Sequence, residues 1–355
     1  MNNIEKVKES IRMKNIDALL VTGAINRRYV TGFSSSAGIV LITKEDAFFY
    51  TDSRYIEAAE QAVQGAKVYM VDSKATYVDK INNVLTSIGA KKLGVEEEIL
   101  SHAEYMKYKN KLSASLKPAQ NILTALRTVK DEEEIKLLYL AQSLAEKAYD
   151  RVLQIIKPGM TEKEVAAELV YQILLLGADN VSFDPIVVSG AKTSMPHGVP
   201  GDDIIKKGSF LTMDFGCILN GYCSDMTRTV AIGKVTEEMK KVYQIVLQAQ
   251  LRGIKAAKAG VTGAYVDAAA RDLIAQEGYG EYFGHGFGHG LGMEVHESPT
   301  ASPSGKTKMP ENAVISAEPG IYLPGKFGVR IEDVIVLRKG GCDNLMSAPK
   351  ELVVI

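Results

Sequence analysis

The sequence predicts an α+β protein: a small α/β domain over residues 1–125, followed by a larger domain over residues 126–355 that carries an internal repeat. A length of 355 residues is too great for one ordinary hydrophobic core and suits two domains of ~100–200 residues. Short helical and strand patterns alternate in the first third of the chain. The rest contains two similar helical segments, each followed by strands, so we expect two α/β halves that face each other.

The composition excludes several classes of protein. With 46% hydrophobic and 24% charged residues, the chain is expected to be globular, not disordered or fibrous. The 42 Lys and Arg residues against 43 Asp and Glu residues leave a net charge of −1, which argues against nucleic acid or an anionic membrane as partner. No apolar stretch approaches the ~20 residues of a membrane helix, and we see no signal peptide. Three cysteines imply no disulfide framework, so a reducing, cytoplasmic location is expected.

The amino-terminal domain is expected to alternate helices and strands. Ile4, Val7 and Ile11 recur at helical spacing and predict a helix over Asn3–Asn15. The only histidine of this domain, His102, is expected on a surface helix. The other predicted elements are a helix over Asp52–Gln64 with an Asp or Ser cap, and strands over Ile16–Val21, Gly38–Thr43, Ala47–Tyr50, Lys67–Val71 and Lys92–Val95, of which the second and third form a hairpin.

A long charged amphipathic stretch, residues 123–149, is expected to lead into the second domain. The four acidic residues Asp131–Glu134 open a helix there, as acidic first turns tend to do. We interpret the remaining charges as a solvated helix face.

The second domain contains a repeat at an offset of 101 residues, since Lys157–Thr161 recurs as Lys258–Thr262. The aligned stretches share seven identities in 21 positions. Both copies predict a helix, a glycine that ends it, a threonine cap and a second helix. Helix–Gly–Thr–helix is a common pattern, but this number of identities favours a duplicated unit. A site between the two halves is then expected.

Two aspartates lie on a predicted hairpin. Asn220-Gly221 is a strong turn signal, and an apolar strand is predicted after it over Tyr222–Ile232. If these two residues form the loop, Asp214 pairs with Thr227, and Asp225 is the diagonal neighbour of Asp214 on the same face. Two carboxylates aimed together repel each other unless a positive group lies between them. From this hairpin alone, one of the two could instead be a solvent-facing strand residue.

Glycine occupies every other position from Gly284 to Gly292. An extended chain there has one bare face, which lets another group approach closely, and one face that carries His285 and His289. The spacing does not match the nucleotide-binding pattern G-x-G-x-x-G. Four of the five histidines fall in the stretch from His197 to His296, and neutral imidazole is a common ligand for transition metals.

Two glutamates, Glu318 and Glu332, lie in apolar, β-branched surroundings. Charged residues are seldom buried unless they are paired or bind a metal, and pairing with Arg330 would explain a single glutamate. With the two aspartates, however, the domain holds four such carboxylates. Four negative charges would neutralise two divalent cations, with one imidazole as a neutral ligand. Carboxylate-rich ligands with one histidine suit Mn²⁺, Co²⁺ or Fe²⁺.

Taken in order, these residues resemble the ligand set of the pita-bread, M24-type metallopeptidases, the family of methionine aminopeptidase, aminopeptidase P and prolidase. The set is Asp214, Asp225, His289, Glu318 and Glu332. Segments around it match as well, and Asn26–Gly32 and Thr51–Tyr55 resemble the extra amino-terminal domain of the proline-specific branch. The matching segments of the second domain are Ser182–Val187, Met195–Gly198, Gly284–Glu297, Glu318–Tyr322 and Gly328–Asp333. The resemblance implies a creatinase-type amino-terminal domain and a pita-bread catalytic domain with a pseudo-twofold repeat.

The resemblance also implies a role for each ligand. Asp225 and Glu332 would bridge two metal ions, Asp214 would bind one of them, and His289 with Glu318 would hold the other. A bridging hydroxide would attack the carbonyl before proline, and Glu318 would shuttle its proton. The expected cofactors are two divalent ions, Mn²⁺ first, with Co²⁺, Fe²⁺ or Zn²⁺ as alternatives.

Four further residues receive roles from the resemblance. His197 and His296 would contact the substrate carbonyl and stabilise the developing oxyanion. His285 would lie near the prolyl ring and shape its pocket. Arg330 would orient Glu332 or its neighbours.

The choice of substrate rests on one departure from the family pattern. Prolidases of similar length tend to place an arginine just beyond the His-Glu-x-Pro motif, where it can bind a free carboxylate after proline. Here Thr300–Pro310 contains only Lys306 and Lys308. A lysine could replace that arginine as a point charge, without its bidentate fit. We therefore expect an aminopeptidase P acting on peptides with proline at the second position, with an Xaa-Pro dipeptidase as the alternative.

Two other classes are weighed against a peptidase. A non-catalytic peptide-binding member of the fold is expected to lose ligands, and a creatinase-like hydrolase of a small guanidino compound uses the fold without metal. The complete ligand set speaks against both. Because the family commonly dimerises, a homodimer through the amino-terminal domain is expected.

Overall fold

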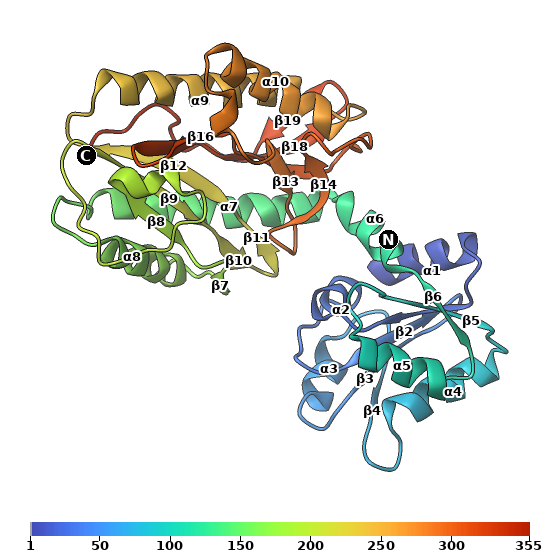
Figure 1. Ribbon diagram of the computed structural model, residues 1–355. Helices are drawn as coiled ribbons and strands as arrows, with labels where there is room; N and C mark the ends of the chain where they lie inside the picture. The colour runs from blue at the N-terminus through green and yellow to red at the C-terminus, as the bar shows by residue number, and fades with distance from the viewer. Residues whose placement is uncertain (1) are drawn as a thin grey trace. The chain divides into compact units, whose positions relative to one another are not determined.

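The computed structural model describes residues 2–355 and divides into two compact units, Met1–Leu126 and Arg127–Ile355 (Figure 1). Each unit has hydrophobic clusters of its own. None of the helices within residues 2–355 combines the length with the apolar character that a bilayer crossing demands.

The first unit is a six-stranded mixed sheet in the order β4-β3-β2-β1-β5-β6 (Figure 1). The central strands β1, β2 and β3 are antiparallel neighbours, and β4, β5 and β6 join them in parallel. The strands are β1 (Ala18–Val21), β2 (Ile39–Thr43), β3 (Ala47–Thr51), β4 (Lys67–Met70), β5 (Lys92–Val95) and β6 (Ser115–Pro118). The helices are α1 (Asn3–Met13), α2 (Ala24–Thr31), α3 (Ile56–Ala62), α4 (Tyr77–Ser87), α5 (His102–Lys111) and α6 (Gln120–Thr128).

The predicted elements of this unit are present with small shifts, and one boundary is wrong. The helix expected from Asp52 begins at Ile56, and its cap residue Tyr55 makes no side-chain capping bond. The reason is that the Asp52 carboxylate accepts hydrogen bonds from the backbone and guanidinium of Arg54, which forms a turn before the helix. The surface helix expected at His102 is confirmed, since this exposed residue begins α5. The sequence does not predict α2, α4 or β6.

The second unit contains two helix pairs and several antiparallel sheets (Figure 1). One core lies between α7, α8 and the sheet β12-β9-β8, and another between α9, α10 and the sheet β14-β13-β15-β18-β19. The helices are α7 (Glu132–Leu153), α8 (Glu162–Leu175), α9 (Glu237–Ala256), α10 (Gly263–Gln276), η1 (Gly190–Ser194) and η2 (Gly280–Tyr282). The strands are β7 (Asn180–Val181), β8 (Ile186–Ser189), β9 (Ser209–Phe215), β10 (Cys217–Leu219), β11 (Tyr222–Cys223), β12 (Met226–Ile232), β13 (Gly288–Gly290), β14 (Glu297–Ala301), β15 (Val314–Ala317), β16 (Gly320–Leu323), β17 (Phe327–Arg330), β18 (Asp333–Arg338) and β19 (Gly341–Asn344).

The internal repeat is confirmed by the helices. Both α8 and α10 have 14 residues, and both begin after a threonine whose hydroxyl accepts the capping hydrogen bond, Thr161 and Thr262. The turns before them contain Gly159 and Gly260 at φ values of 97° and 86°, which a side chain would strain. The charged stretch before the first copy contains the helix expected to start at its acidic residues, since Asp131 caps α7 in a capping box with Glu134.

The predicted register of the hairpin is confirmed, but its second strand is not continuous. Leu219 pairs with Tyr222, and Asp214 pairs with Thr227. The strand expected over Tyr222–Ile232 is interrupted between β11 and β12. At this point the two strands approach closely, since an added Cβ at Gly216 would lie 2.0 Å from the carbonyl oxygen of Ser224.

Two other segments around the site also contain breaks or little strand. The apolar run before Arg338 is split into β17 and β18, and Glu332 lies in the gap with its N–H bonded to the Thr227 carbonyl. The extended chain expected over the glycine-rich segment is a strand only at Gly288–Gly290. Irregular backbone therefore carries three of the predicted ligands, Asp225, Glu318 and Glu332.

We predict that Gly253→Ala destabilises the second unit, although alanine in a helix interior normally gains ~1 kcal/mol over glycine. A Cβ at this position of α9 would lie 2.2 Å from the ring of the fully buried Phe287, so overpacking should cost about 1–3 kcal/mol. Thermal unfolding measures the effect. Gly340→Ala, where an added Cβ meets nothing within 4 Å, is the control. A stabilised Gly253→Ala variant would contradict the packing described.

Candidate functional site

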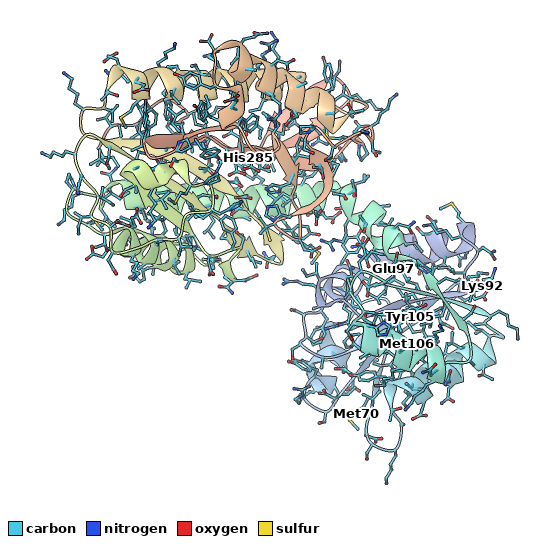
Figure 2. All side chains as sticks on the ribbon, in the orientation of Figure 1. Met70, Lys92, Glu97, Tyr105, Met106 and His285 are labelled. Atoms are coloured by element: carbon cyan, nitrogen blue, oxygen red, sulfur yellow. The ribbon has the colours of Figure 1, made fainter. Side chains whose placement is uncertain are left out.

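A cavity of about 480 Å³ in the second unit brings together every residue that the sequence predicts for the site. Figure 2 labels His285, one of the residues that line this cavity. The predicted residues that line the cavity are His197, Asp214, Asp225, His285, His289, His296, Glu318, Arg330 and Glu332. Apolar lining comes from Phe183, Ile186, Pro196 and Val295.

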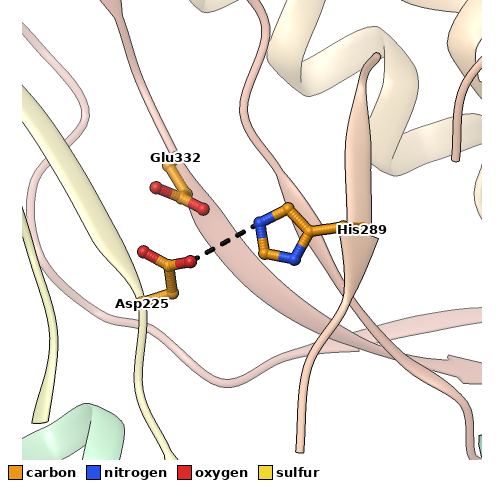
Figure 3. Close-up of side chains that lie close together, drawn as sticks. All are labelled: Asp225, His289 and Glu332. Carbon is orange, nitrogen blue, oxygen red and sulfur yellow. Dashed lines mark ion pairs between the residues drawn. The ribbon is translucent and has the colours of Figure 1, made fainter. Parts of the chain in front are cut away.

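The side chains of Asp225 and Glu332 lie close to the imidazole of His289 (Figure 3). One ligand atom each of Asp225, His289 and Glu332 lies within 4.8 Å of the others. The Nε2 atom of His289 is 3.5 Å from Asp225 Oδ2 and 3.3 Å from Glu318 Oε1. Its Nδ1 atom lies 3.1 Å from the carbonyl of Gly290 and donates to it, which leaves the Nε2 lone pair free to bind a metal.

The strand ends bring these donors together. Asp214 lies near the end of β9 and Glu318 directly follows β15, whereas Asp225 and Glu332 occupy the two gaps between strands. The N–H of Asp225 donates to the Gln142 side chain from α7 at 3.3 Å. Because Gly288 lacks a side chain, β13 can approach β15: an added Cβ would lie 2.0 Å from the Ser316 carbonyl oxygen. The interpretation of the bare glycine face as a surface for close approach is thus confirmed.

The electrostatics of the cluster fit bound cations. Two buried carboxylate oxygens, Asp214 Oδ1 and Glu332 Oε1, have no hydrogen-bond partner within residues 2–355. Burial, and then repulsion by neighbouring carboxylates, raises the pKa of Asp225 and of Glu332 well above the ordinary values. Burial also raises the pKa of Glu318, to about 7. Four carboxylates and one imidazole with free acceptor atoms form a donor set that suits two divalent cations.

Arg330 is the guanidinium that faces this cluster. Its carboxylate partner is Asp214, with which it forms a salt bridge, and it contacts Glu332 only through Thr227. The Thr227 hydroxyl accepts from Arg330 Nε at 3.0 Å and donates to Glu332 Oε2 at 2.8 Å. The guanidinium also donates to the Tyr322 hydroxyl and to the Pro196 carbonyl. Four hydrogen bonds from one rigid, planar side chain thus hold these four residues in fixed positions relative to one another.

The three other histidines differ in their surroundings. His285 Nε2 is 2.8 Å from the Tyr322 hydroxyl, and burial, together with the nearby Arg330, lowers the pKa of His285 to about 4. Its ring is therefore neutral at neutral pH. The ring of His296 lies 4.1 Å from that of His289, and burial followed by this neighbour lowers the pKa of His296. His197 is exposed at the edge of the cavity.

The sequence does not single out two residues that connect the site, Thr227 and Tyr322. A signal for Thr227 exists in the hairpin register, because the residue paired with Asp214 must lie beside the cluster. Tyr322 belongs to a segment that matches the family, but only the fold shows that its hydroxyl joins His285 to Arg330.

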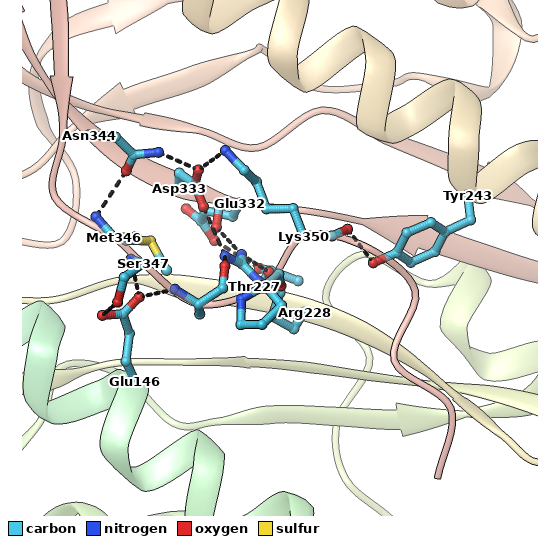
Figure 4. Close-up of polar contacts among 12 residues, drawn as sticks. Glu146, Thr227, Arg228, Tyr243, Glu332, Asp333, Asn344, Met346, Ser347 and Lys350 are labelled. Atoms are coloured by element: carbon cyan, nitrogen blue, oxygen red, sulfur yellow. Dashed lines mark hydrogen bonds and ion pairs between the residues drawn. The ribbon is translucent and has the colours of Figure 1, made fainter.

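A buried polar cluster lies behind Glu332 (Figure 4). The guanidinium of Arg228, 1% exposed, forms an ion pair of 2.9 Å with Asp333 and donates to the carbonyls of Thr227 and Glu332. It also donates to Ala348 and Pro349, so the chain after β19 is held by the same group. Lys350 and Asn344 complete the hydrogen bonds of Asp333. Arg228 therefore fixes the backbone at Glu332 and at the start of β18 from the core side of the sheet.

Comparison with known families decides the class of the protein. The profile of Metallopeptidase family M24 matches residues 136–339, and that of the Creatinase/Prolidase N-terminal domain matches residues 3–129. The chain belongs to metallopeptidase family M24. The fold class and the enzyme class expected from the sequence are thus confirmed for this M24 peptidase.

Several M24 proteins align with almost the whole length of this chain. The Xaa-Pro dipeptidase of Pyrococcus horikoshii is 37% identical over 99% of this chain and 98% of its own. Among solved structures, the Xaa-Pro dipeptidase from Bacillus anthracis has a TM-score of 0.95 and 40% identity, with 99% of each chain covered. The X-Pro aminopeptidase from Thermotoga maritima has a TM-score of 0.92 and 39% identity, covering 98% of this chain and all of the other.

We predict that Arg228→Met lowers the free energy of unfolding of this M24 peptidase by about 3 kcal/mol, because it leaves buried carbonyls and a buried carboxylate short of a partner. The matched control is Arg338→Met, whose ion pairs with Glu132 and Asp343 lie at the surface and contribute less than about 1 kcal/mol. Denaturant unfolding of both variants provides the comparison. Equal losses would show that the cluster in Figure 4 does not support the fold.

Proposed function

We propose that this protein is a metal-dependent exopeptidase that hydrolyses the Xaa-Pro bond at the amino terminus of peptides, as aminopeptidase P does. The observation that carries the proposal is the convergence of four carboxylates and His289 on one cavity, with unsatisfied acceptor atoms that a cation would fill. Specificity for proline is inferred from the similar proteins named as Xaa-Pro peptidases.

The proposed ligands divide between two divalent ions. Asp225 and Glu332 would hold both ions, Asp214 would hold one, and His289 with Glu318 would hold the other. Bound cations supply an activated water and polarise the scissile carbonyl. The Arg330 guanidinium keeps Asp214 oriented, and the Thr227 hydroxyl does the same for Glu332.

The histidines act on the substrate. His197 and His296 donate hydrogen bonds to the oxygen of the scissile carbonyl as negative charge develops on it. His285 and Tyr322 border the pocket of the prolyl ring, and His285 remains neutral because it is buried beside Arg330. Glu318 moves the proton from the attacking water to the leaving amine.

The cavity favours longer peptides over dipeptides. A dipeptidase must bind the free carboxylate directly after proline, yet among the residues that line the cavity the only lysine or arginine is Arg330, which Asp214 already neutralises. Lys306 and Lys308 are exposed and do not line the cavity. An Xaa-Pro dipeptidase is the second candidate, because two of the similar proteins carry that name.

Three finer properties belong to this proposal. We assign Mn²⁺ as the first metal, with Co²⁺, Fe²⁺ and Zn²⁺ as alternatives, since carboxylates dominate the donor set. We assign a cytoplasmic location from the three free cysteines, of which two are buried. We also assign a homodimer through the amino-terminal domain. Elemental analysis and sedimentation of the purified protein test the metal and the dimer.

We predict that Mn²⁺ added to chelator-treated protein raises its midpoint of thermal unfolding, since a ligand at 100 times its Kd stabilises the folded state by about 2.7 kcal/mol. Asp225→Asn should abolish most of this shift and lower kcat at least about 100-fold. Asp343→Asn, which changes a carboxylate paired with Arg338 at the surface, should retain both. A full Mn²⁺ response in Asp225→Asn would remove Asp225 from the ligand set.

We predict that kcat/KM is higher for Xaa-Pro-Xaa-Xaa than for the dipeptide Xaa-Pro. The reason is that no unpaired lysine or arginine lines the cavity to bind a carboxylate after proline. The same peptides with alanine in place of proline are the control and should be cleaved poorly. Cleavage of the dipeptide alone would make the protein a dipeptidase. Equal cleavage of the alanine peptides would refute specificity for proline.

A further inference from the structure

The segment that carries His197 has little secondary structure of its own. It runs from the end of β8 through the short helix η1, and no further strand begins until Ser209. The His197 side chain is exposed. A cavity of about 740 Å³ borders the segment along Ser189–Ser194 and Asp202–Ile204, so packing on that side is open. The position of the ring therefore depends on what holds the backbone.

One fully buried carboxylate, that of Glu162, holds both ends of this segment. Its Oε1 atom accepts hydrogen bonds from the N–H of Ser189 at 2.6 Å and from the Ser189 hydroxyl at 3.2 Å. Its Oε2 atom accepts from the N–H of Gly201 at 3.0 Å and from Lys192 Nζ at 2.6 Å. Ser189 and Gly201 bracket His197 in the sequence, so a single side chain closes the loop that presents this histidine.

We propose that Glu162 is a positioning residue for His197. It touches neither the proposed metal ligands nor the cavity, and it acts by fixing the backbone from which His197 reaches the substrate carbonyl. The inference rests on the proposed function, because that function gives His197 its role.

The start of α8 reinforces this connection. Glu162 is the first residue of the helix, and the N–H groups of Glu162 and Lys163 donate to the carbonyls of Asp203 and Gly201. Helix N-terminal N–H groups need such partners, and the positive end of the helix dipole favours a carboxylate there. Lys192 supplies the remaining compensation for a charge that would be costly to bury alone.

In the second copy of the repeat, the start of the helix contacts the corresponding segment through backbone alone. Gly263 of α10 occupies the position of Glu162, and an added Cβ there would lie 1.9 Å from the Thr300 carbonyl oxygen. Thr300 lies on β14, which begins directly after His296 and pairs with β13, the strand that carries His289. Both repeat helices thus begin against a segment that carries one of the two proposed oxyanion histidines. The first copy uses a carboxylate for this contact, and the second uses direct backbone approach.

The opposite side of the His197 segment is tied to the ligands. Arg330, which binds Asp214, also donates to the carbonyl of Pro196 at 3.2 Å. Thr193 Oγ1 accepts from the N–H of Gly328 at 2.8 Å. With Glu162 on one side and Arg330 on the other, the backbone at His197 is fixed relative to the candidate metal centre.

The test is a double-mutant cycle between Glu162→Gln and His197→Ala. The glutamine amide places an NH₂ group against donors, either Gly201 and Lys192 or Ser189, so one end of the loop is released. A displacement of about 1 Å can cost on the order of 100-fold in rate, so kcat for Xaa-Pro-Xaa-Xaa should fall about 10- to 100-fold with little change in KM. In the His197→Ala background, Glu162→Gln should cause no further loss.

The matched control is Glu164→Gln, two residues farther along the same helix. Glu164 belongs to the capping box with Thr161, which glutamine can also form, and it does not contact the His197 segment. This variant should retain kcat within about twofold. Metal content should be unchanged in all variants. Hydrogen exchange at the amides of Ser189 and Gly201 should be faster in Glu162→Gln than in Glu164→Gln.

The outcomes separate this inference from the proposed function. Equal losses from Glu162→Gln with and without His197 would overturn the inference, as would unchanged amide exchange. If the wild-type protein does not cleave Xaa-Pro peptides, the proposed function fails, and amide exchange still reports whether Glu162 holds the loop. Should Glu162→Gln not fold, Lys192→Met removes only the cationic partner and should give a smaller loss of kcat that also disappears in His197→Ala.

Discussion

The second unit is organised around an electrostatic problem: four carboxylates converge in a buried space that contains one guanidinium. Arg330 balances Asp214, but Asp225, Glu318 and Glu332 have no cation of their own, and burial raises the pKa of each. Such an arrangement is costly for a folded chain unless cations fill it. The rest of the unit can be understood as the framework that holds these groups together against their repulsion.

Breaks in the strands solve the geometric part of this problem. A continuous strand presents a side chain to a given face only at every second residue, which limits how many donors can meet. Here the chain leaves the strand geometry at Asp225 and Glu332. The N–H of Asp225 donates to the Gln142 side chain, and the N–H of Glu332 donates to the Thr227 carbonyl. Arg228 and Asp333 stabilise the second gap from within the core. Glycines at 216 and 288 provide the close approaches that the breaks need.

Much of this could be predicted from the sequence, because the deciding signals are local. Asn220-Gly221 determines the hairpin register and thereby the pairing of Asp214 with Thr227. The threonine caps and glycines reveal the repeat. The strand breaks could not be predicted, since the apolar runs through 222–232 and 328–337 have continuous β-propensity and the interruptions arise from tertiary contacts. From the sequence alone, Glu162 is indistinguishable from an ordinary exposed acidic residue in the first turn of a helix. Its burial depends on a loop that returns to it some forty residues later.

The donors of the candidate metal centre come from both halves of the repeat. Asp214 and Asp225 belong to the first half, whereas His289, Glu318 and Glu332 follow the second helix pair. Cations held between them would cross-link segments that are remote in the sequence, much as a disulfide closes a long loop. Neither half carries enough donors to bind a pair of ions by itself. Metal supply in the cell would therefore govern how long each molecule survives proteolysis, in addition to how fast it works.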